Sequence, residues 1–91
     1  MSQSPKLVLI EWVDSHSGRG WQPFERFAEV AEPLYCQSVG WLVNYNDACK
    51  VLVPHVGGEK NGGQMLQGCG DITIPTASIR KVTVLRREER E

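Results

Sequence analysis

The sequence has no apolar run close to the ~20 residues that a membrane-spanning helix needs. It also lacks a signal-peptide pattern, because the polar start MSQSPK leads directly into an apolar stretch without a small-residue cleavage site. We therefore expect a cytoplasmic protein without a membrane partner. Charge of one sign is not in excess either, since 10 Lys and Arg residues stand against 11 Asp and Glu residues. A nucleic acid is accordingly less expected as a partner than a protein or a small molecule, because its phosphates attract basic surfaces.

Cysteine is scarce, and its spacing argues against the usual cysteine sites. The three cysteines, Cys36, Cys49 and Cys69, form an odd-numbered set without a Cys-x-x-Cys pair. A zinc knuckle needs two ligands separated by two to four residues, and neither His16 nor His55 supplies that spacing. We predict three free thiols, no bound metal and no cofactor.

Catalytic motifs are also missing. The glycine-rich stretch from Val56 to Gly70 is not a phosphate-binding Walker loop, because Asn61 rather than Ser or Thr follows Lys60. Its backbone N–H groups beside Lys60 can still hold a small anion, and the competing interpretation is a flexible hairpin extension. No pattern fixes a nucleophile, base and orienting group together, so we predict that the protein is not an enzyme.

What the chain does contain is enough apolar sequence for one core. Its 91 residues are 41% hydrophobic and 23% charged, as in ordinary globular proteins. Division into two domains would leave each with too little apolar surface to offset chain entropy. We expect a single domain over residues 1–91, with residues 6–85 folded and residues 86–91 forming a solvated charged tail.

The stretch from Leu34 to Pro54 predicts a central β-hairpin. Its first arm alternates, with one face expected to point into the core, namely Tyr35, Val39, Trp41, Val43 and Tyr45. Asn46-Asp47 predicts the turn, because both side chains bond to their own main chain. The β-branched and aliphatic run from Cys49 to Val53 predicts the second arm.

The remaining elements are expected to cover this hairpin. Strand patterns occupy Lys6–Val13, Asp71–Ile74 and Ile79–Leu85, and a short strand is compatible with Gln64–Gln67. Helical spacing occupies Gln22–Glu32 and is stopped by Pro33, while Thr76–Ser78 predicts a single turn. The pattern indicates a mostly β fold: a small SH3-like, five-stranded, partly open barrel with one short helix after the first strand. An OB-fold is the nearest alternative, but its helix usually lies later in the chain.

Four segments carry a resemblance to a known group. They are EWVDS (Glu11–Ser15), Gly20-Trp21, SVGWLV (Ser38–Val43) and an Ile-Pro pair followed by a hydrophobic strand (Ile74–Leu85). Together they resemble a group of small phage and prophage proteins of unassigned function. The resemblance implies an accessory protein expressed inside a bacterial host, and it brings no functional residues.

Candidate binding residues cluster around the loop after the first strand. Trp12 and Trp21 flank this loop, where they form either an aromatic wall for a partner or a cap on the barrel end. His16 and Arg19 lie within the loop, and Arg19 would place a charge beside Trp21.

These features favour a non-enzymatic phage accessory protein that binds a host or anti-phage defence component. The first alternative is a sponge or regulatory module that holds a small anionic ligand, such as a nucleotide, with Trp21, Arg19 and Lys60. The second alternative is a nucleic-acid-binding barrel. The sequence leaves a homo-oligomer open.

Overall fold

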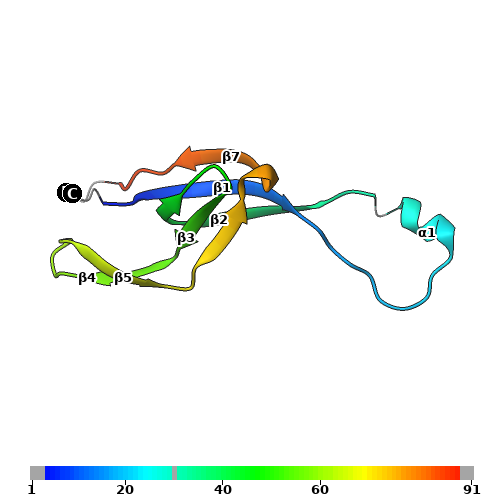
Figure 1. The fold of residues 1–91 in the computed structure, drawn as a ribbon, viewed down its shortest axis with the longest axis horizontal. Coiled ribbons are helices and arrows are strands. Elements are labelled where there is room, and N and C mark those ends of the chain that lie inside the picture. Colours follow the sequence, from blue (N-terminus) through cyan, green and yellow to red (C-terminus); the bar gives the residue numbers. More distant parts are fainter. Residues whose placement is uncertain (1–3, 30, 89–91) are drawn as a thin grey trace.

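The computed structural model describes residues 4–29 and 31–88 and shows a mostly β chain (Figure 1). Its strands are β1 (Lys6–Asp14), β2 (Leu34–Tyr45), β3 (Cys49–Val53), β4 (His55–Gly58), β5 (Met65–Cys69), β6 (Ile72–Pro75) and β7 (Ile79–Val84). The helical parts are α1 (Phe24–Ala28) and a 3-10 turn (Thr76–Ser78). The prediction of a mostly β fold with one short helix after the first strand is confirmed.

Five of the strands form one antiparallel sheet in the order β6-β3-β2-β1-β7. Strands β6 and β7 are its two edges, so the sheet is not a closed barrel. Strands β4 and β5 pair only with each other, as a separate hairpin between β3 and β6. This hairpin occupies the glycine-rich stretch, for which the sequence favoured a flexible hairpin extension and indicated one short strand at Gln64–Gln67.

The core lies on one face of the five-stranded sheet, which we call the core face. Alternation in β1 places Val8 and Ile10 on it, and these side chains are fully buried with Leu52 and Ile74. The opposite face, which we call the outer face, takes the intervening β1 residues Leu7, Leu9 and Val13, which are half-buried. Alternation along the sequence predicts these faces, with Val8, Ile10 and Trp12 on one and Leu7, Leu9 and Val13 on the other, and the structure agrees.

The facing of β2 is the reverse of the prediction. Gly40 is buried and Leu42 packs against the core, whereas Tyr35 and Val39 are 64% and 53% exposed on the outer face. Trp41, expected in the core, pairs with Leu7 and is half-buried on the outer face. The alternation was correct, but the larger side chains point away from the core because β1 offers apolar neighbours on both of its faces.

The turn between β2 and β3 is held by Asn46, as predicted. Its side-chain Oδ1 accepts hydrogen bonds from the backbone N–H groups of Ala48 at 2.7 Å and Cys49 at 3.0 Å. The Ala48 carbonyl in turn accepts a bond from the Thr76 N–H at 2.8 Å, which ties the 3-10 turn to this hairpin. The turn thus fixes both the hairpin register and the approach to β7.

Replacing Asn46 with alanine is expected to lower the free energy of unfolding by about 1 kcal/mol, because two backbone N–H groups lose their acceptor while remaining open to water. Chemical denaturation would measure the loss. The matched control is Asp47→Ala in the same turn, since Asp47 provides neither of these bonds. Equal losses for the two variants would contradict this role of Asn46.

The helix is shorter than the predicted Gln22–Glu32. It spans only Phe24–Ala28, no residue in it is buried, and its cap Pro23 makes no side-chain hydrogen bond. So short a helix gains little from its own hydrogen bonds, and the helical pattern had no sheet face to pack against. Residue 30 of the predicted helix lies outside the described residues. So do residues 89–91 of the predicted tail, whereas residues 86–88 are exposed and belong to no strand.

Within the described parts of the chain, no helix has both the length and the apolar character required to cross a membrane.

Candidate functional site

Residues 15–29 and 31–33 leave the sheet between β1 and β2 and form a projecting arm (Figure 1). We call this segment the arm; it carries α1 near its far end. The molecule measures 58 × 31 × 23 Å, and its radius of gyration is 17.8 Å. A compact domain of this length has a radius of gyration of about 12 Å, so the arm accounts for much of the elongation.

The arm presents aromatic side chains to solvent. Trp21 is fully exposed, at 104% of its reference accessibility, and Phe24 and Phe27 are 88% and 51% exposed. The two phenyl rings contact each other, with centroids 6.2 Å apart and planes tilted by 49°. Aromatic side chains of this kind dominate the energetics of protein interfaces, so their concentration on a projecting segment makes it a candidate binding surface.

Short local interactions give the arm its shape. The His16 Nε2–H donates to the Glu32 carbonyl at 2.6 Å and thereby joins the two sides of the arm at its base. Nearer the tip, the Gln22 side-chain amide donates to the Arg19 carbonyl at 3.3 Å. Gly20 sits between them with a φ of 77°, a left-handed conformation that favours glycine. The hydrogen bond and the left-handed Gly20 therefore define the backbone conformation on either side of Trp21.

The structure separates the residues that the sequence proposed for one site. Trp12 is half-buried against the core, and its indole Nε1–H donates to the Ser38 Oγ at 3.0 Å. Trp12 therefore has a structural role, and it does not form an aromatic wall with the exposed Trp21. His16 and Arg19 do lie in the arm. His16 makes the hydrogen bond to Glu32 that joins its two sides, and Arg19 is an exposed cation.

Lys60 lies at the other end of the molecule. It is exposed in the turn between β4 and β5, at the opposite end of the long axis from the arm (Figure 1). One small anion therefore cannot contact Lys60 together with Arg19 and Trp21. The three residues named for the nucleotide-holding alternative therefore do not form one binding site.

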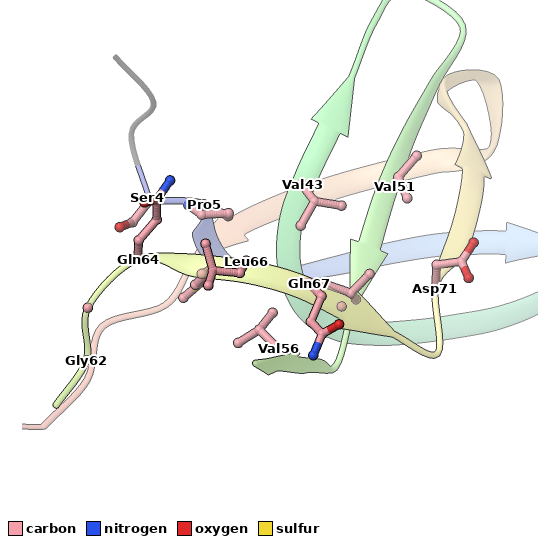
Figure 2. A pocket seen from close by; sticks show the side chains of 14 residues that line it. Ser4, Pro5, Val43, Val51, Val56, Gly62, Gln64, Leu66, Gln67 and Asp71 are labelled. Atoms are coloured by element: carbon pink, nitrogen blue, oxygen red, sulfur yellow. The ribbon is translucent and has the colours of Figure 1, made fainter. Parts of the chain in front are cut away.

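A second candidate surface is a cleft between the β4–β5 hairpin and the outer face of β2 and β3. Its volume is about 910 Å³. Figure 2 shows Val43 and Val51 on the sheet side, and Val56 and Leu66 on the hairpin side. The polar groups at the cleft are mostly uncharged; the charged side chain among them is Asp71. We call this hollow the cleft.

Sequence reasoning missed both Phe24 and the cleft. Phe24 belonged to the helical spacing over Gln22–Glu32 and was not among the candidate binding residues. The signal that pointed to its exposure was the flanking glycine and proline content, which left the helix too short to pack. The cleft depends on β4, whose sequence HVGG has no alternating pattern. Only the pairing of His55 with Cys69 and of Val56 with Gly68 makes it a strand.

The potential metal ligands of residues 4–29 and 31–88 are dispersed. No three side chains of His, Cys, Asp or Glu there lie close enough to hold a metal ion together. All three cysteines are free thiols in this structure: Cys36 and Cys49 are half-buried and Cys69 is exposed.

No protein-family model matches this chain, and neither a curated protein nor a solved structure matches it.

Proposed function

We propose that this protein is a non-enzymatic interaction protein that acts by docking its arm onto another protein. The observation that carries the proposal is the exposure of Trp21 and Phe24 on a projecting segment whose helix has no buried residue. Exposing this much apolar surface costs free energy unless a partner covers it, and such patches commonly mark interaction sites. Arg19 adds a cation next to Trp21, which suits a partner groove that combines apolar walls with an acidic rim.

The partner that we propose is a host protein or an anti-phage defence component in a bacterial cytoplasm. This part rests on the resemblance of the segments around Trp21 and Trp41 to small phage and prophage proteins. The arrangement also supports an SH3-like, partly open barrel as the fold. In its favour are the long excursion after β1, the tight β2–β3 hairpin and the 3-10 turn before β7, with the β4–β5 hairpin as an addition.

A nucleic-acid partner is less well supported by the arm. Its two arginines are Arg19 and Arg26, and the Arg26 guanidinium lies 3.7 Å from the Glu29 carboxylate. Few positive charges therefore remain to neutralise phosphates. Salt dependence separates the two classes, because binding to phosphates weakens steeply as salt rises, whereas an apolar protein interface responds much less.

The arm variants Trp21→Ala, Phe24→Ala and Arg19→Ala are expected to weaken partner binding by at least about 1 kcal/mol each, with the largest loss for Trp21. Affinity capture from bacterial lysate would identify the partner, and titration of the purified pair would give the loss. The matched control is Tyr45→Ala, an exposed aromatic residue of β2 outside the arm. Binding is compared at equal folded fraction by circular dichroism. Loss with Tyr45→Ala but not with the arm variants would contradict the proposal.

A further inference from the structure

The chain carries two large apolar surfaces that cannot meet each other. The aromatic residues of the arm lie at one end of the long axis, and the cleft beside the β4–β5 hairpin lies at the other (Figure 1). The molecule is 58 Å long, so the arm cannot fold back into the cleft of its own chain without dismantling the strands between them. Any arm that enters the cleft must come from another molecule.

The cleft matches the arm tip in size and chemistry. Pockets of about 300–1,000 Å³ enclose drug-sized groups, and an indole together with a phenyl ring falls in this class. The cleft volume of about 910 Å³ lies in that range. Its walls carry Val43 and Val51 from the sheet and Leu66 from the hairpin, which Figure 2 shows around the opening. Aromatic rings gain from contact with such aliphatic walls, and uncharged Gln64 and Gln67 provide amides for the arm's main chain.

The area available is enough for a stable dimer. A buried aromatic side chain removes about 150–250 Å² from water, so Trp21 and Phe24 of one arm contribute on the order of 400 Å². Two arms and the two surfaces that receive them then bury on the order of 1,600 Å², which is the standard size of specific protein interfaces. A reciprocal exchange also satisfies the symmetry of a closed dimer, because each copy offers the same arm and the same cleft.

We infer that, without its partner, the protein is a homodimer in which the arm of each copy occupies the cleft of the other. The inference rests on the proposed role of the arm in binding. It adds that dimerisation regulates the access of a partner protein to the arm. In the dimer Trp21 and Phe24 are covered, so a partner protein must compete with the second copy for the arm. The apparent affinity for the partner therefore falls as the concentration of the protein rises, because a growing fraction of the arms is held in dimers.

Sedimentation equilibrium of the purified full chain tests the exchange. Wild-type protein should show a monomer–dimer equilibrium, and its Trp21 emission should move to shorter wavelength as the dimer forms. A Trp21→Phe variant supplies the background signal of Trp12 and Trp41. The double arm variant Trp21→Ala/Phe24→Ala and the cleft variant Leu66→Glu should each raise the dimer dissociation constant at least about tenfold. All substituted residues are exposed, so circular dichroism should show folded proteins.

Mixing the two variants gives the sharper result. The intact arm of Leu66→Glu can enter the intact cleft of the double arm variant, so the mixture should recover a heterodimer that neither variant forms alone. A monomeric wild-type protein would overturn the inference. So would dimers that are insensitive to either variant, or a mixture that stays monomeric. The proposed function fails separately, if the arm variants still bind the partner protein.

Discussion

Truncating Leu52 to alanine is expected to lower the free energy of unfolding by about 2–5 kcal/mol, one of the two largest effects among the substitutions considered. Leu52 is 1% exposed and lies in β3 opposite Leu42 and Ile72, at the centre of the small core. Only four side chains are fully buried in the described residues, so neighbouring groups have little freedom to fill the cavity. Domains of this size are stable by about 5–15 kcal/mol, and the variant would lose a large share of that stability.

Denaturation in urea would measure this loss, with Leu34→Ala as the matched control. Leu34 undergoes the same truncation, but it is 50% exposed at the start of β2 and does not line the cleft, so its change should stay within about 0.5 kcal/mol. A similar midpoint for the two variants would mean that Leu52 does not lie at the centre of the core.

A valine in place of Gly40 is the second substitution with a large expected effect. Gly40 is buried in β2, and a Cβ atom there would lie 2.9 Å from the backbone oxygen of Val53 and 3.3 Å from the Leu52 Cβ. Backbone at this distance must shift, and overpacking of this kind costs about 1–3 kcal/mol or more. Valine is a favourable strand residue by itself, so a loss of stability would oppose its intrinsic preference.

Thermal or chemical unfolding would detect the loss, and Gly57→Val is its matched control. A Cβ atom at Gly57 in β4 would meet only the Gln67 side chain, at an ordinary distance of 3.6 Å. That variant should keep its stability or gain slightly from strand preference. If Gly40→Val were as stable as the wild-type protein, β2 and β3 would not approach as closely as the structure shows.

Elements with a strong local pattern were predictable. The alternation in β1, the β-branched run in β3, the Asn46 turn and the single turn at Thr76–Ser78 all appear in the structure close to their predicted positions. Each depends on contacts within a few residues or on a period of two along one strand. Local signals of this kind do not depend on what the rest of the fold does.

The facing of β2 was not predictable from its own residues. Both faces of β2 carry apolar side chains that could pack in a core. The large side chains of Trp41 and Tyr35 favoured their face as the buried one. The decision is made by Gly40, whose missing side chain allows β3 to come close on the core face. That requirement is visible only once β3 is in place, because it concerns a contact between two strands.

The position of the arm in the chain was predictable, but the exposure of its aromatic side chains was not. Its serine and glycine content indicated a loop, and Trp21 and Arg19 were recognised as candidates there. Helical spacing predicted one short helix over Gln22–Glu32, and the observed helix is shorter still and has no buried residue. Exposure is a property of the whole fold, since it depends on whether any other element covers these rings.

The most direct test of the account is photo-crosslinking from position 21. A photoreactive phenylalanine analogue in place of Trp21 reports which chain lies against the arm, and the same analogue in place of Tyr45, an exposed aromatic residue of β2 outside the arm, serves as the control. If the arm is the binding element, position 21 gives strong intermolecular adducts, either with the partner protein or with a second copy at the cleft, and position 45 gives few. Adducts only within the same chain at position 21, together with partner adducts at position 45, would contradict the claim that the arm is the binding element.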